Sequence, residues 1–323
     1  MKIGTLILLL ASIPICAQQR SVSPEIVGRD IISTPHDEFG GAWDVAGRVI
    51  YFNLSIPKGY LYAICSSHQA TSGQWGSPQV MPFSGRYRDS DPVLSPDGEH
   101  LYFVSDRPVA AEQHRDFDIY VAGRKGKTWG EPRRLSETIN SDQAEYFASE
   151  AKSGNLYFTS SRKGSLGSID VYRAVWRDGE FERVENLGPN INAPGVANIE
   201  AFIAPDESYL LLGTFGRSDS FGSADLYISF NRGGQFSTPV HLPAGINTPS
   251  RDYSPRISSD GKWFLFASEA NPAMSPPAQP WTTQQIGMIR TSIRNGLGNI
   301  YRLPIEALNL DQMRREITAQ PQN

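Results

Sequence analysis

The chain has 323 residues, of which 39% are hydrophobic, and it contains 29 glycines and 23 prolines. This content of turn-forming residues excludes a helical bundle, while the length allows one large domain or two. The formal net charge is −4, which excludes a typical nucleic-acid binder because phosphate contacts require clustered Lys and Arg.

The first predicted element is a secretory signal peptide, residues 1–17. A positively charged start is followed by an apolar stretch from Ile3 to Ile15 and by the small residue Ala17, after which we expect cleavage. The apolar stretch is shorter than the roughly 20 residues that span a bilayer, so no transmembrane segment is expected. An alternative is a lipoprotein anchored through Cys16, but Ile15 stands where such signals have a small residue. We therefore predict a periplasmic or secreted protein.

A hairpin pattern then recurs along the chain. Each copy has a strand, a tight turn and a second strand, and the turn residues are separated by 51, 56, 53 and 54 residues. A fixed period of this length indicates a propeller or a solenoid. The copies are "WDVAGRVIYF" (43–52), "LSPDGEHLYF" (94–103), "SEAKSGNLYF" (149–158), "IAPDESYLLL" (203–212) and "ISSDGKWFLF" (257–266).

Each period continues with two more short strands, which makes four strands, or one propeller blade. The fifth unit ends after its third strand. Residues 23–35, "SPEIVGRDIISTP", share the spacing of "TPVHLPAGINTP" (238–249) and can supply the missing strand. We therefore predict an all-β, five-bladed propeller over residues 18–310, closed by an N-terminal strand in the last blade and followed by a tail, 311–323. Six blades remain the alternative.

The repeat resembles that of TolB-like propellers, which also occurs in tricorn-like and dipeptidyl-peptidase-like propellers. The residues that carry the resemblance are "SPDGEHLYFVSDR" with "FDIYVA", "SSDGKWFLF" and the ending "GNIYRL". The resemblance implies a propeller and says little about activity, because this fold occurs in hydrolases, lyases and passive binders. TolB-like propellers often serve as adaptors, which implies an envelope protein or a glycan as partner.

Charged residues recur at two places in the repeat. Acids precede the first strand of each unit, and basic residues follow the second strand of three units. One interpretation is structural, with each acid capping turn amides or pairing with an arginine. The other is functional, with acids converging on a channel mouth to bind a cation, a sugar or a basic peptide. The acids are Glu38, Asp91, Glu145, Glu200 and Asp252, with Asp37, Asp89 and Asp142 as close competitors, and the basic residues are Arg107, Arg162 and Arg217.

The fifth unit contains a long loop, residues 271–297, between its second and third strands. Long loops in compact folds are often functional. We expect this loop to fold over the same face as the acids, with Trp281 as a candidate platform for a sugar ring or a peptide. Trp281 filling a hydrophobic dent in its own loop is the alternative.

Other site motifs are absent from the sequence. There is no Gly-x-Ser-x-Gly elbow, phosphate loop or dinucleotide fingerprint, and the five histidines occupy different repeat positions. We therefore expect no cofactor and no metal. The favoured function is a binding or scaffold propeller of the cell envelope that uses its channel face. The alternative is a carbohydrate-active hydrolase or lyase, with Glu145 and Glu200 as the candidate catalytic pair.

Overall fold

The computed structural model describes residues 23–56, 59–109, 116–271 and 277–319. The predicted signal peptide, with Cys16, lies outside these ranges and stays a prediction. No helix among the described residues is long and apolar enough to cross a membrane.

The recurring hairpin forms around a tight turn with local side-chain support. In the second copy, Gly98 has a φ of 74°, which glycine adopts without steric cost. The Asp97 carboxylate accepts hydrogen bonds from Ser95 Oγ at 2.6 Å and from the Glu99 amide at 3.0 Å. The fourth copy lacks the glycine, and Glu207 adopts a φ of 58° in its place.

Five antiparallel sheets result, one for each repeat, as predicted. In the second and fourth sheets the outermost strand is divided into two short strands that both pair with the third strand. The strands of the first three sheets are β2 (Asp37–Asp44), β3 (Val49–Ile56), β4 (Leu61–His68) and β5 (Gln79–Val80); β6 (Asp89–Leu94), β7 (His100–Ser105), β8 (Asp118–Lys125), β9 (Thr128–Trp129) and β10 (Arg133–Arg134); and β11 (Glu145–Glu150), β12 (Leu156–Ser160), β13 (Asp170–Arg177) and β14 (Glu180–Asn186). Those of the last two are β15 (Ala197–Ile203), β16 (Tyr209–Phe215), β17 (Ala224–Arg232), β18 (Gln235–Phe236) and β19 (Val240–His241); and β20 (Asp252–Ile257), β21 (Trp263–Ser268), β22 (Asn299–Pro304) and β1 (Glu25–Ile26).

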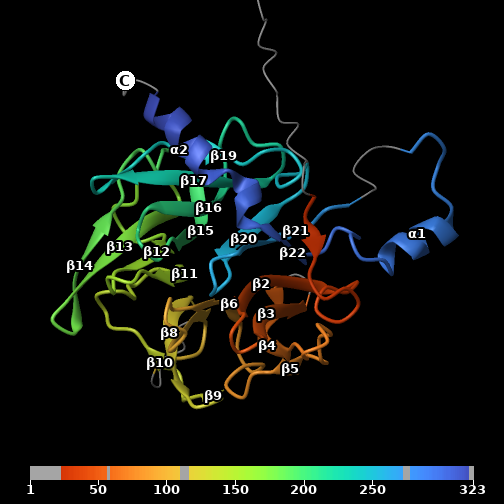
Figure 1. Ribbon diagram of the computed structural model, residues 1–323, viewed down its shortest axis with the longest axis horizontal. Helices are drawn as coiled ribbons and strands as arrows, with labels where there is room; N and C mark the ends of the chain where they lie inside the picture. Colours follow the sequence, from red (N-terminus) through yellow and green to blue (C-terminus); the bar gives the residue numbers. More distant parts are fainter. Residues whose placement is uncertain (1–22, 57–58, 110–115, 272–276, 320–323) are drawn as a thin grey trace, which may run out of the picture.

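The five sheets close into a ring. The first strands of consecutive sheets contact one another from β2 through β6, β11 and β15 to β20, and β20 contacts β2 again. Figure 1 shows the sheets arranged around a common centre. The protein is therefore a five-bladed β-propeller, with β2, β6, β11, β15 and β20 lining its central channel.

The N-terminal segment closes the ring, as the sequence match predicted. Strand β1 pairs with β22, the third strand of the fifth blade. Asn247 accepts a hydrogen bond from the Leu226 amide and donates one to the Leu226 carbonyl, both in β17. Ser33, at the matching position, bonds the amide and the carbonyl of Ile300 in β22. The matching spacing thus reflects the same contact in both places.

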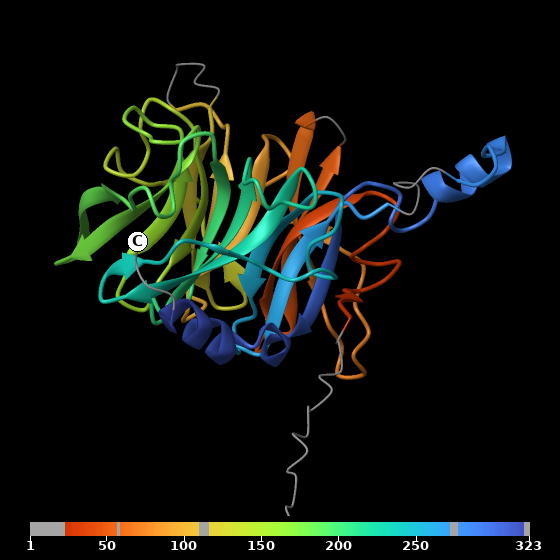
Figure 2. The same ribbon diagram turned by 90° about the horizontal axis from the view of Figure 1, so that it is seen from above.

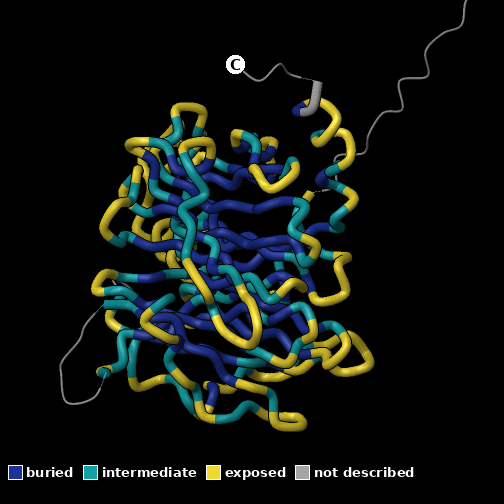
Figure 3. Tube along the Cα trace, turned by 90° about the vertical axis from the view of Figure 1, so that its left-hand side faces the viewer, coloured by how far each residue is buried: buried dark blue, intermediate teal, exposed yellow. Residues whose placement is uncertain are grey.

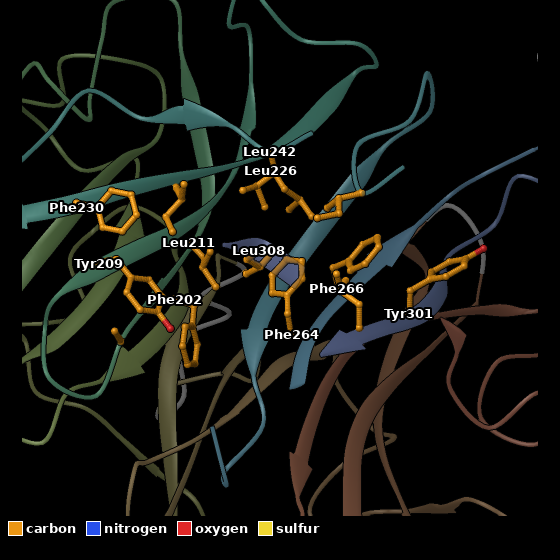
Figure 4. Packing of buried hydrophobic residues seen from close by; sticks show 14 of the residues in the cluster. Phe202, Tyr209, Leu211, Leu226, Phe230, Leu242, Phe264, Phe266, Tyr301 and Leu308 are labelled. Atoms are coloured by element: carbon orange, nitrogen blue, oxygen red, sulfur yellow. The ribbon is translucent and has the colours of Figure 1, made fainter. Parts of the chain in front are cut away.

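Hydrophobic clusters join neighbouring blades. Figure 4 shows one of them, in which Phe202, Tyr209 and Leu211 of the fourth blade face Phe264 and Phe266 of the fifth. Buried residues run through the middle of the molecule, while exposed residues gather in the turns (Figure 3). The segment after the propeller forms helix α2 (Leu310–Ala319), whose Ile317 packs into the same cluster.

Candidate functional site

The predicted acids fall into two structural classes. The first class starts the channel strands and binds groups of its own blade. Glu145 is fully buried and accepts hydrogen bonds from Ser141 Oγ at 2.6 Å and Ser160 Oγ at 2.7 Å. Its carboxylate also contacts the Arg162 guanidinium at 3.1 Å. Burial raises the pKa of Glu145, and these hydrogen bonds oppose the shift.

The same arrangement recurs around the ring. Asp89 binds Ser84, Ser105 and Arg107, the last at 2.7 Å. Glu38 and Asp252 accept hydrogen bonds from Thr34 and Thr248, respectively. Burial raises the pKa of Asp252 to about 6. The structural interpretation therefore fits Glu38, Glu145 and Asp252.

The predicted arginines belong to these blade contacts. Arg107 and Arg162 pair with the acids of their blades, and Arg217 donates to the Ile191 carbonyl at 3.0 Å and lies over the Tyr227 ring. None of the three lines the cavity described below.

Arg162 offers a test of this structural role. Replacing Arg162 with methionine leaves the buried Glu145 without its cation, so we expect a loss of about 2 kcal/mol in the free energy of unfolding. Urea denaturation of the purified protein measures it. The neighbouring Lys163→Met, at an exposed position, is the control and should change stability by less than about 0.5 kcal/mol. Equal effects of the two variants would contradict the role given to Arg162.

The second class of acids, Asp91 and Glu200, faces the channel. Each channel strand contains a β-bulge or irregularity at or next to the second residue after Glu38, Asp89, Glu145, Asn198 or Asp252. Bulges redirect side chains and are frequent beside functional sites. The residues at this position are Gly40, Asp91, Phe147, Glu200 and Ser254, so only the second and fourth blades supply an ionisable group.

The sequence alignment was therefore shifted by two residues in two blades. Asp91 and Glu200 are not equivalent to Glu145, whose counterparts are Asp89 and Asn198. Asp89 had been only a competitor to Asp91. The predicted pair Glu145–Glu200 is not brought together at one cavity, because Glu145 does not line the cavity that contains Glu200.

Asp91 and Glu200 line a cavity of about 300 Å³ at one end of the channel. Its wall combines aromatic rings with carboxylates. Arg251 is the basic residue of the wall; its guanidinium lies 4.2 Å from the centre of the Tyr253 ring and 3.4 Å from Glu269. The aromatic residues are Phe39, Tyr62, Phe117, Tyr146 and Tyr253, and the carboxylates are Asp37, Asp91, Glu200 and Glu269.

Arg256 lies deeper in the channel, beside Asp91. Its side chain is 1% exposed, and its Nη2 is 3.7 Å from Asp91 Oδ1. None of its three guanidinium nitrogens has a hydrogen-bond partner among the described residues. Burial lowers the pKa of Arg256 to about 10, and the charges of Asp91 and Glu200 oppose this shift. Arg256 also lines a second cavity of about 150 Å³, whose wall includes Trp43 and Phe202.

The sequence analysis missed Arg256, Arg251 and the aromatic wall. Arg256 had a signal that repeat alignment can detect. Arg256 lies four residues after Asp252. The residues four positions after Glu38, Asp89, Glu145 and Asn198 in the other channel strands are Ala42, Val93, Ser149 and Phe202. An arginine there interrupts the pattern of the duplicated unit.

Trp281 lies away from the cavity. The long loop contains helix α1 (Thr283–Arg290), which has no buried residue and begins with a capping box between Thr282 and Gln285. Figures 1 and 2 show α1 projecting from the ring. The expectation that this loop folds over the acids is wrong, and Trp281 is 38% exposed. The capping box at the start of α1 stabilises this helix locally.

No group of three or more His, Cys, Asp or Glu side chains in the described part of the chain is placed to hold a metal ion.

Comparisons with known proteins give the fold a wider context. No family model matches the chain. Among solved structures, the chain is similar to a putative TolB from Agrobacterium tumefaciens, with 14% identity, a TM-score of 0.47, and coverage of 84% of this chain and 91% of that one. It is also similar to an α-L-arabinofuranosidase from Lactobacillus brevis, with 11% identity, a TM-score of 0.45, and coverage of 85% and 92%.

The fold is consistent with a TolB-like propeller family. The described residues form a five-bladed ring, and the repeat motifs carry the resemblance to TolB-like propellers. One curated protein, the UDP-N-acetylmuramoylalanine–D-glutamate ligase of Acetivibrio thermocellus, matches 102 residues at 32% identity. That match covers 30% of this chain and 22% of the ligase, so the chain spans about a fifth of that protein. A TolB-like ring leaves the activity open, and the function must come from the channel site.

Proposed function

We propose that this chain is an exported propeller of the cell envelope that binds the end of a glycan in the channel cavity. The observation that carries the proposal is the wall of five aromatic rings and four carboxylates around about 300 Å³ at the ring axis. This volume is at the small end of ligand pockets, which suits one terminal group better than a long chain. Aromatic faces pack against apolar ligand surfaces, and carboxylates accept hydrogen bonds from hydroxyl groups.

A basic peptide is the competing ligand, because carboxylates outnumber arginines in the wall of the cavity. Arg251 contacts Glu269, and Arg256 lies beside Asp91. These two cations offset part of the negative charge, which weakens the attraction of the cavity for an ammonium or guanidinium group. A neutral ligand rich in hydroxyl groups does not depend on that attraction, because its hydroxyl groups can donate hydrogen bonds to the carboxylate oxygens.

Tyr62 provides the test of the cavity. Tyr62 lines the cavity and packs edge-on against Phe39, with ring centres 5.8 Å apart. We expect Tyr62→Ala to weaken glycan binding at least about tenfold, because it removes one aromatic wall. The measurement is binding of the full chain to a printed oligosaccharide array and to basic peptides, followed by titration of the retained ligand.

Tyr60→Ala is the matched control, since Tyr60 is 77% exposed and two residues away. It should bind like the wild type. Retention of basic peptides alone, or equal affinities of the Tyr62 and Tyr60 variants, would contradict glycan binding in this cavity.

A further inference from the structure

The channel contains three ionisable side chains at positions where the other blades have none; Glu200 and Arg256 are buried, and Asp91 is partly buried. Asp91 and Glu200 occupy the bulge position, which is Gly40 in the first blade. Arg256 occupies the next inward position of the fifth blade. A duplicated unit has no structural need for different charges at equivalent places, so these three residues have a role that the blades do not share.

Glu200 has an oxygen that lacks a protein partner. Its residue is 5% exposed, Oε1 accepts a hydrogen bond from Ser254 Oγ at 3.2 Å, and Oε2 has no partner among the described residues. The strand opposite leaves room for this oxygen, because a Cβ at Gly213 would lie 2.1 Å from Oε2. Oε2 therefore lies against β16 at Gly213, in space that any larger side chain at this position would fill.

Asp91 has a different environment at the same level of the channel. Its Oδ2 accepts a hydrogen bond from Ser90 Oγ at 3.2 Å, and its amide donates to Asn53 at 2.9 Å. Oδ1 faces Arg256, which also lies over the Phe147 ring at 4.9 Å. Burial raises the pKa of Asp91, and the charge of the Arg256 guanidinium is the largest influence that opposes this shift.

Burial raises the pKa of both carboxyl groups, but Asp91 also forms an ion pair with Arg256. Burial, followed by the charge of Asp91, raises the pKa of Glu200 to about 7, and the opposing charges of Arg251 and Arg256 are smaller influences. Burial, and more weakly the charges of Asp37, Glu269 and Glu200, raises the pKa of the Tyr253 phenol in the same wall. Pairs of carboxyl groups in unequal environments are typical of acid–base catalysis.

We propose that this cavity hydrolyses the glycosidic bond of the glycan it binds, with Glu200 as the proton donor, Asp91 as the base and Arg256 as the residue that positions Asp91. The inference rests on the proposed function, because it needs a glycan in the same cavity. It replaces the Glu145–Glu200 pair expected from the sequence with two groups that line one cavity.

The step balances with water as the co-reactant. Glu200 transfers its proton to the glycosidic oxygen, and the bond from that oxygen to the anomeric carbon breaks with both electrons on the oxygen. The oxygen of a water molecule bonds to the anomeric carbon while one of its protons passes to Asp91. One water is consumed for each bond, and Asp91 and Glu200 return to their starting forms by exchanging protons with solvent.

The experiment incubates the full-length protein with each oligosaccharide that the array retains and analyses the products by mass spectrometry. We expect the wild type to release a shortened oligosaccharide whose mass includes one added water. Glu200→Gln and Asp91→Asn should retain binding but cleave roughly 10²–10⁴ times more slowly. Glu180→Gln, at an exposed position in β14, is the control and should cleave like the wild type.

The pH profile tests the individual roles. Cleavage should fall above about pH 7 as Glu200 ionises, and Glu200→Gln should lose this limb together with its activity. Arg256→Lys should keep a cation beside Asp91 and retain the acidic limb of the wild type, whereas Arg256→Met should move that limb to higher pH.

The outcomes separate the two proposals. Retention of a glycan that is recovered intact overturns the hydrolysis and leaves the binding function standing. Failure of every glycan to bind overturns both. If the Glu200→Gln variant cleaves the glycan as fast as the wild type, the assignment of Glu200 as the proton donor is overturned.

Discussion

Replacing Ile32 with alanine is expected to lower the free energy of unfolding by about 2–5 kcal/mol. Ile32 is fully buried and belongs to the hydrophobic cluster that includes Phe52 of the first blade and Ile300 of the fifth. The variant leaves a cavity at the point where the N-terminal segment joins the two ends of the ring. Chemical denaturation with the wild type and the variant measured side by side gives the difference.

Ile31→Ala is the matched control, because Ile31 is the preceding residue and is 36% exposed. We expect it to change the free energy of unfolding by less than about 1 kcal/mol. If the two alanine variants were equally stable, the N-terminal segment would not hold the ring closed in the manner described.

Replacing Glu200 with glutamine is expected to stabilise the protein at pH 8 by roughly 2–4 kcal/mol. The pKa of Glu200 is about 7 in the folded protein against an ordinary value of 4.5. Between these two values the folded protein holds a proton that the unfolded chain has released, so wild-type stability falls as the pH rises through this range. Above about pH 7 the folded protein contains a buried charge that glutamine removes.

The sign of this effect distinguishes it from ordinary damage to a core. At pH 4 the carboxyl group is protonated in both states, and the Glu200→Gln variant should then match the wild type. Denaturation curves at pH 4, 6 and 8 provide the measurement, with Glu306→Gln at an exposed position as the control. A variant that is less stable than the wild type at pH 8 would show that the Glu200 carboxylate stabilises the fold.

The ring could be predicted from the sequence because its signals are local and repeated. Each hairpin contains its own turn, as with Asp97 and Gly98, and five copies reinforce one another. Closure was predictable because the segment around Ser33 must make the contact that the segment around Asn247 makes in the fourth blade.

The site was predicted only in part, because its residues depend on backbone geometry. The repeat alignment matched Asp91 to Glu145. In the structure the counterpart of Glu145 is Asp89, two residues earlier. The bulge that turns Asp91 into the channel gives this residue a φ of 55°. The presence of an aspartate in the sequence does not predict this backbone conformation. Arg251 and Tyr62 belong to different blades and come together at the cavity only when the ring is closed. A local sequence pattern does not predict such a contact.

The positions of the segments outside the ring could not be predicted from the sequence either. The direction of the loop that contains Trp281 depends on tertiary contacts, and a polar, proline-rich sequence does not encode them. Helix α2 packs against the fourth and fifth blades through Ile317. The packing of its apolar residues depends on the neighbouring blades and therefore could not be predicted from this segment alone.

The most direct test of the central claim is a crystal structure of the protein with an oligosaccharide that the array retains. The account predicts the terminal sugar between Tyr62 and Tyr253, with a polar atom of the ligand within hydrogen-bonding distance of the Glu200 carboxyl group. An oligosaccharide seated instead in the larger cleft beside β22, which is lined by Phe266 and Leu303, or on the projecting helix α1, would contradict it.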